Sequence, residues 1–139
     1  MTSLLRKLTP EYRNISFVDI ITKYRMPIAA YISILHRISG ALLFFFLPFL
    51  LFLFDKSLTS ELIFNAFIAA LSNIAIRLAI TVILWSFIFH FCSGIRHLLM
   101  DLNHDLSTKE SGKLTSIVVL SVSSILTFSV ALKFSTIVF

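Results

Sequence analysis

The sequence predicts an all-α integral membrane protein with three transmembrane helices. Of its 139 residues, 58% are hydrophobic, including 15 phenylalanines, and only 14% are charged, whereas soluble domains carry about 25% charged residues. Three stretches lack acidic and basic side chains apart from one histidine, and they cover residues 38–54, 78–95 and 114–132. At a rise of about 1.5 Å per residue, each stretch approaches or matches a hydrocarbon core about 30 Å thick.

Residues 1–26 are expected to form a cytoplasmic arm, because they mix charges with short apolar runs. Within the arm, "SFVDIITKY" has the pattern of a short amphipathic helix at the membrane surface. The first transmembrane helix is expected over about residues 27–54. Pro27 fits the first turn of a helix, and Pro48 inside the helix predicts a kink.

The later elements follow from alternating polar and apolar segments. "DKSLTS" reads as a polar turn, and residues 61–76 are too rich in asparagine and serine for a clear span, so we expect a helix along the outer interface. The second and third transmembrane helices are expected over about 74–99 and 114–137, joined by the polar loop "DLNHDLSTKESGK". No boundary divides the chain, which predicts a single membrane-anchor domain over residues 1–139.

Basic residues predict the orientation in the membrane. The arm carries five lysines and arginines and the second loop region three, whereas the first loop has only Lys56. By the positive-inside rule, the N-terminus and the second loop face the cytoplasm and the C-terminus lies outside. The basic residues are scattered at membrane boundaries, so no nucleic-acid partner is expected. Three helices with little soluble mass favour one part of a heteromeric helix bundle over a self-contained enzyme.

His90 is the first candidate for chemistry, because ionisable side chains at membrane depth are costly and indicate function. A neutral imidazole there needs a partner for its ring N–H or a metal for its free nitrogen. Two interpretations follow: a hydrogen bond to a neighbouring helix, or an axial bond to haem iron. Gly94 lies on the same helix face one turn later and would leave room for a flat macrocycle.

Two residues near the cytoplasmic end of the same span follow from the haem interpretation. If His90 binds iron, His97 and Arg96 lie where the haem propionates would point; the alternative is contact with lipid headgroups. A haem with two histidine ligands would need its second ligand from a partner subunit, or from His36 if the first span lies close.

Ser33 and Arg37 share a face of the first span at its cytoplasmic edge, and His36 is turned from Arg37 by about 100°. A hydroxyl and a guanidinium at that depth suit a quinone, whose carbonyls accept hydrogen bonds and whose reduction takes up protons. The alternative is an arginine that reaches a lipid phosphate while Ser33 bonds to its own helix.

Two motifs connect these residues to a known family: S-x-x-H-R-x-S-G in "SILHRISG", and H-x-x-x-G-[IL]-R-H-x-x-x-D in "HFCSGIRHLLMD". In this order and topology, the chain resembles the large cytochrome b membrane-anchor subunit of succinate dehydrogenase, respiratory complex II. The resemblance implies that His90 is an axial ligand of haem b, shared with a small anchor subunit that supplies the second ligand. It also implies that Ser33 and Arg37 line the ubiquinone site.

The resemblance carries further expectations. His36 and His97 would lie near the haem edge and propionates, and Asp101 would serve proton delivery or subunit docking. The chain would catalyse nothing alone, but would anchor a flavoprotein and an iron–sulfur subunit to the lipid membrane in a succinate:quinone oxidoreductase. The bacterial inner membrane is favoured over the mitochondrial inner membrane. The anchor of a quinol:fumarate reductase, a haem-free structural subunit and a non-redox membrane component stay open as alternatives.

Overall fold

A computed structural model describes residues 14–138 of the protein, and within this part it contains helices and no strand. The helices are α2 (Phe17–Thr22), α3 (Ile28–Thr59), α4 (Glu61–Ala70), α5 (Ile74–Leu102), the short 3-10 helix η1 (His104–Ser107) and α6 (Lys109–Val138). The predicted all-α class is therefore confirmed. The first half of the predicted arm, residues 1–13, lies outside the described residues.

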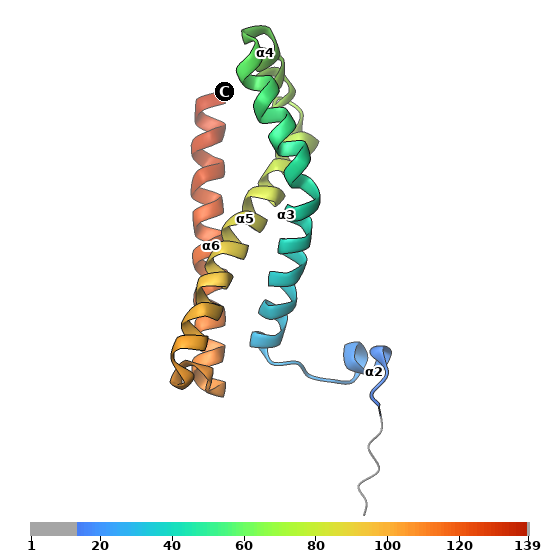
Figure 1. Cartoon of the computed structure of the whole chain (residues 1–139), viewed down its shortest axis with the longest axis vertical. Coiled ribbons are helices and arrows are strands. Elements are labelled where there is room, and N and C mark those ends of the chain that lie inside the picture. Colours follow the sequence, from blue (N-terminus) through green and yellow to red (C-terminus); the bar gives the residue numbers. More distant parts are fainter. Residues whose placement is uncertain (1–13, 139) are drawn as a thin grey trace, which may run out of the picture.

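The long helices α3, α5 and α6 run up, down and up side by side (Figure 1). Helix α5 packs against both α3 and α6. Three segments are long and apolar enough to cross a membrane: Ile28–Thr59, Ile74–Leu102 and Lys109–Thr136. The chain is thus a multi-pass membrane protein with three spanning helices. All three helices extend beyond the uncharged stretches, because a helix satisfies its own backbone hydrogen bonds in water as well as in lipid.

Local sequence signals define where the helices begin. Pro27 directly precedes α3, where its missing N–H costs nothing. Helix α3 continues past Pro48, and its ribbon curves along its length in Figure 1. The side chain of Asn73 accepts a 2.8 Å hydrogen bond from the N–H of Ala75 and caps α5. The predicted polar turn at "DKSLTS" is wrong, because α3 continues to Thr59 and only Ser60 separates it from the next helix. The helix predicted after it is present as α4, which ends before this cap.

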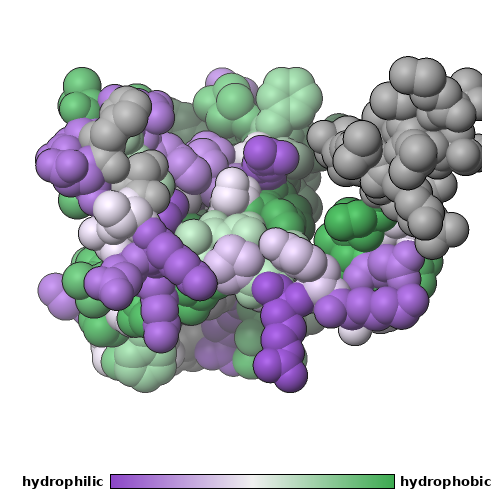
Figure 2. All heavy atoms as spheres, turned by 90° about the horizontal axis from the view of Figure 1, so that it is seen from below, coloured by the Kyte–Doolittle hydropathy of each residue, from purple (hydrophilic) through white to green (hydrophobic). Residues whose placement is uncertain are grey.

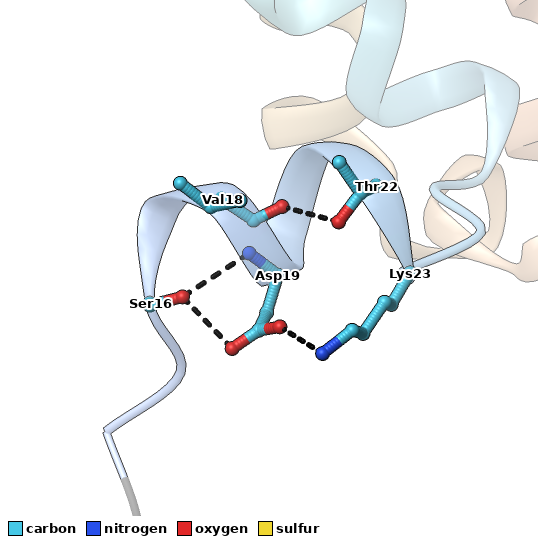
Figure 3. A network of polar contacts seen from close by, with 5 residues as sticks. All are labelled: Ser16, Val18, Asp19, Thr22 and Lys23. Atoms are coloured by element: carbon cyan, nitrogen blue, oxygen red, sulfur yellow. Dashed lines mark hydrogen bonds and ion pairs between the residues drawn. The ribbon is translucent and has the colours of Figure 1, made fainter.

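Helix α2 lies beside the lower end of the bundle (Figure 1). It confirms the predicted short helix within "SFVDIITKY". Figure 3 shows its polar side, where Ser16 bonds both the N–H and the carboxylate of Asp19, and Lys23 lies 2.6 Å from the same carboxylate. Lys23 and then Ser16 lower the pKa of Asp19. Phe17 is 76% exposed, which gives α2 an apolar side as well.

Small hydroxyl side chains fill the buried contacts between the long helices. The buried polar residues of α5 and α6 include Ser86, Ser93, Ser116, Ser123 and Thr127. Small residues let membrane helices approach closely, and most of these hydroxyls bond a carbonyl of their own helix. The buried apolar core is correspondingly small and centres on Ile32, Phe89 and Val119. Most large apolar side chains face outward, where lipid or partner helices would cover them.

Candidate functional site

Three histidines gather where α3 and α5 pack against each other. The rings of His36 and His90 are stacked, with centroids 4.2 Å apart and planes 16° from parallel. The ring of His97 lies 5.1 Å from that of His36 and is tilted by 41°. The first span therefore does lie close to the second, and it brings one histidine of the first motif against two of the second motif.

The hydrogen bonds of His90 determine which of its ring nitrogens is free. Its Nδ1 lies 3.0 Å from the carbonyl oxygen of His36 and 3.2 Å from Oγ of Ser39. A carbonyl oxygen only accepts, so Nδ1 carries the proton and donates it. Nε2 is then the nitrogen with the free lone pair, and within residues 14–138 it makes no hydrogen bond. A metal-binding histidine commonly donates its other ring N–H to a carbonyl in this way.

Two glycines give these rings their space. A Cβ added at Gly40 of α3 would lie 2.7 Å from Cε1 of His90, so the imidazole packs directly on the α3 backbone. A Cβ at Gly94 of α5 would lie 3.7 Å from Nε2 of His36, which is an ordinary contact. Gly40 is therefore required for the observed position of His90. Gly94 has no side chain to fill the space on α5 beside the histidines.

An open hollow of about 460 Å³ lies beside the histidines. Its lining residues are His36, His90, Phe91, Gly94, Ile95, His97 and Leu98. One imidazole nitrogen with a free lone pair, a glycine and several apolar side chains are the features that a flat, apolar macrocycle with a central metal requires. The residues present thus fit one face of a haem.

The histidines do not form a complete metal site by themselves. An ion held between two imidazole nitrogens separates them by about 4 Å along a line that lies in both ring planes. The stacked rings of His36 and His90 cannot face an ion from opposite sides in this way. No group of three or more histidine, cysteine or acidic side chains within the described residues is placed to hold a metal ion. A second axial ligand would have to come from elsewhere.

Arg96 lies apart from the histidines, although it directly precedes His97. Its side chain points to α6, where Nε donates to Oγ1 of Thr115 at 3.0 Å and Nη2 donates to the carbonyl of Gly112 at 3.3 Å. It is only 5% exposed. Consecutive helix residues are rotated by about 100°, so α5 presents His97 to α3 and Arg96 to α6. The hydrogen bonds of Arg96 in this structure are thus made to α6, and its contact with haem propionates stays a prediction.

Ser33 and Arg37 lie in the first third of α3, and Asp101 lies in the last turn of α5. The start of α3 and the end of α5 are both at the lower end of the bundle in Figure 1. Ser33 is half-buried, and Arg37 and Asp101 are exposed. Among the described residues, neither the Ser33 hydroxyl nor the Arg37 guanidinium has a hydrogen-bond or ion-pair partner. The expected alternative, in which Ser33 bonds to its own helix, is absent from this part of the chain.

The end that carries these residues is polar. Figure 2 views it from below and shows many hydrophilic side chains on it, with apolar ones between them and at the margins. Polar groups on this end come from α2, the start of α3, the end of α5 and the start of α6. The hollow beside the histidines lies in the half of the bundle nearer to this end, because His36 is in the first third of α3 and His97 is in the last turns of α5.

Sequence reasoning missed two residues of the site, Ser39 and Gly40. Both belong to the motif S-x-x-H-R-x-S-G, but the sequence alone assigned them no role. The signal that could have found them is their spacing, since residues three and four positions after His36 share its helix face.

Comparison with known proteins supports the resemblance that the motifs suggested. Residues 10–130 match the family described as succinate dehydrogenase/fumarate reductase transmembrane subunit. The chain belongs to this family. Together with the three spanning helices, the match makes it a membrane-anchor cytochrome subunit of the complex II type.

Individual relatives agree with the family. A protein of Coxiella burnetii is 38% identical over 106 residues, which cover 76% of this chain and 84% of the relative. A protein of Rickettsia bellii is 37% identical over 91 residues, 64% of this chain and 69% of the relative. A protein of Rickettsia prowazekii is 32% identical over 89 residues, 64% and 68%. All three are named succinate dehydrogenase cytochrome b556 subunit.

Proposed function

We propose that the chain binds haem b through Nε2 of His90, in the membrane anchor of a succinate:quinone oxidoreductase. The observation that carries this proposal is the hydrogen bond from Nδ1–H of His90 to the carbonyl of His36, because it leaves Nε2 unprotonated beside the hollow. The name cytochrome b556 subunit of the relatives supports the same cofactor.

A small anchor subunit that covers the open hollow would supply the second ligand of the iron. The stacked arrangement of His36 and His90 supports this division, since His36 cannot be the opposing ligand. The rim of the hollow offers a surface for such a partner. Phe91 is 61% and Leu98 is 65% exposed, and apolar side chains around a site of this kind favour a helix–helix contact.

A bound haem would supply a one-electron carrier whose potential depends on ligation and burial. The chain's own residues would hold and orient it. His90 would provide a nitrogen ligand, and Gly94 would let the ring approach α5. His97 lies two turns from His90 toward the polar end, where it and His36 can donate hydrogen bonds to the propionates.

Ser33 and Arg37 form this chain's part of a ubiquinone-reduction site. Both side chains lack a partner among the described residues and lie at the polar end of α3, so their donors are available for the carbonyl oxygens of a quinone. Asp101, exposed one turn after His97, serves proton delivery or docking at the same end. The flavoprotein and iron–sulfur subunits dock on this end, and electrons from succinate reach the quinone there.

The polar end faces the cytoplasm of a bacterium, with the chain in the inner membrane. Among the described residues, more lysines and arginines lie toward this end than toward the other, which agrees with the positive-inside rule. Those toward this end are Lys23, Arg25, Arg37, Arg96, Lys109 and Lys113, and those toward the other are Lys56, Arg77 and Lys133.

The experiment that tests the proposal compares His90→Ala with His97→Ala in the purified, assembled complex. We expect His90→Ala to lose most of the haem b and His97→Ala to retain it, because only His90 supplies an axial ligand. Haem content per complex is measured as the pyridine haemochrome. Full haem content in His90→Ala would refute the ligand assignment.

A further inference from the structure

The segment Ser39-Gly40 ends the first motif and has no role in the function proposed above. Both residues face α5, and Ser39 is buried. Ser39 and Gly40 follow His36 by three and four positions, so all three lie on one face of α3. The contacts of this face with His90 give the segment a function.

Three polar atoms are hydrogen-bonded to one another in a triangle: Nδ1 of His90, Oγ of Ser39 and the carbonyl oxygen of His36. Oγ of Ser39 donates to the carbonyl oxygen of His36 at 2.8 Å. Nδ1–H of His90 donates to the same carbonyl at 3.0 Å and to Oγ of Ser39 at 3.2 Å. Ser39 thereby holds the position of the carbonyl and also accepts from the imidazole, so two acceptors direct the same N–H.

Gly40 supplies the other half of this arrangement. A side chain at position 40 would begin 2.7 Å from Cε1 of His90, a distance shorter than any carbon–carbon contact allows. The imidazole therefore packs directly against the backbone of α3 at Gly40. The two acceptors determine which ring nitrogen is protonated, and the contact with Gly40 determines where the ring lies.

We propose that Ser39 and Gly40 are positioning residues that set the tautomer and the orientation of His90 as an iron ligand. This inference rests on the proposed haem function of His90. It predicts that changes at these positions alter haem binding although neither side chain reaches the haem. Changes to the outer partners of a metal-binding histidine typically cost about 10–100-fold in affinity or activity.

The first test is Gly40→Ala in the assembled complex, with Gly112→Ala as the matched control. A Cβ at Gly112 would lie 3.9 Å from Cβ of Ala29, so the same substitution is accommodated there. We expect Gly40→Ala to release haem to excess apomyoglobin at least about tenfold faster than wild type. Gly112→Ala should release it at the wild-type rate.

The second test is Ser39→Ala, with Ser86→Ala as its control. Both serines are 3% exposed, but the Ser86 hydroxyl bonds only the carbonyl of Val82 in its own helix. We expect Ser39→Ala to assemble and to bind haem, to release it about tenfold faster, and to shift or broaden the electron paramagnetic resonance signal of the ferric haem. Ser86→Ala should leave both properties unchanged.

The outcomes separate the inference from the function on which it rests. If wild type contains haem that depends on His90, but Ser39→Ala shows wild-type release and an unchanged ferric signal, the positioning role is refuted. If the Gly40→Ala complex does not assemble, Ser39→Ala decides alone. If the wild-type complex contains no haem, or keeps it in His90→Ala, the proposed function itself fails.

Discussion

At His90, the neighbouring acceptors decide the chemistry of a side chain that would otherwise be ambiguous. Either nitrogen of a neutral imidazole can carry the proton. The carbonyl of His36 removes that freedom by accepting from Nδ1. The two interpretations that the sequence left open, a hydrogen-bonded histidine and a metal ligand, are therefore compatible, because one nitrogen serves each purpose.

Ser33 and Arg37 allow a separate test at the residue scale. We expect Ser33→Ala and Arg37→Leu each to lower kcat/KM for quinone reduction by succinate about 10–100-fold, because each removes a donor of a hydrogen bond worth about 1–3 kcal/mol. Succinate oxidation with an artificial dye should survive, since it bypasses the quinone.

The control for this test is Ser129→Ala, which removes an exposed serine from α6. It should leave both activities unchanged. Wild-type quinone kinetics in both Ser33→Ala and Arg37→Leu would remove these residues from the quinone site.

Among the elements, α5 has two distinct faces. One presents His90 and His97 to α3, and the other presents Arg96 to α6, where it bonds Thr115 and Gly112. The guanidinium thereby links the end of α5 to the start of α6 across η1. Its role in this structure is to hold two helices in register.

Arg96→Ala tests this role. We expect a lower melting temperature of the complex, because two hydrogen bonds from a buried charged group, each worth about 1.5–3 kcal/mol, are lost. Arg96→Lys should recover part of the loss. Assembled Arg96→Ala complex should keep its haem.

Arg37→Ala is the control for stability, since Arg37 is exposed and without a partner among the described residues; it should melt like wild type. An Arg96→Ala complex that melts normally but lacks haem would instead place Arg96 at the cofactor.

Hydropathy predicted the three spanning helices, because each depends on its own residues. The short helix around Asp19 and helix α4 follow from local signals in the same way. Hydropathy did not predict where α3 ends, since the polar segment "DKSLTS" continues the helix to Thr59. The partner of Arg96 could not be predicted, because the rotation of α5 relative to α6 depends on the packing of both helices. The stacking of His36 on His90 and the requirement for Gly40 likewise arise only where α3 meets α5.

The molecule as a whole has the surface of a subunit. Its buried apolar core is small, its large apolar side chains face outward, and its histidine hollow is open. Three helices of this composition can span a lipid bilayer, but the hollow beside α3 and α5 is open on one side. A second anchor subunit would cover this open side and supply the missing ligand.

Expression of the chain without a partner anchor tests this view of the whole molecule. We expect the isolated chain in detergent to bind haem weakly, with one axial position open, because His36 is stacked on His90 and cannot bind the iron from the opposite side. Haem titration and the spin state of the ferric form report this. A tightly bound, low-spin haem in the isolated chain would show that it supplies both ligands itself.

We propose above that His90 holds a haem b shared with a partner subunit. The most direct measurement is the reduced-minus-oxidised absorbance spectrum of the purified wild-type complex, with the haem quantified per copy of this chain. We predict a b-type α-band that corresponds to one haem per copy. A complete complex, with every subunit present in equal amount and no such band, would contradict the claim.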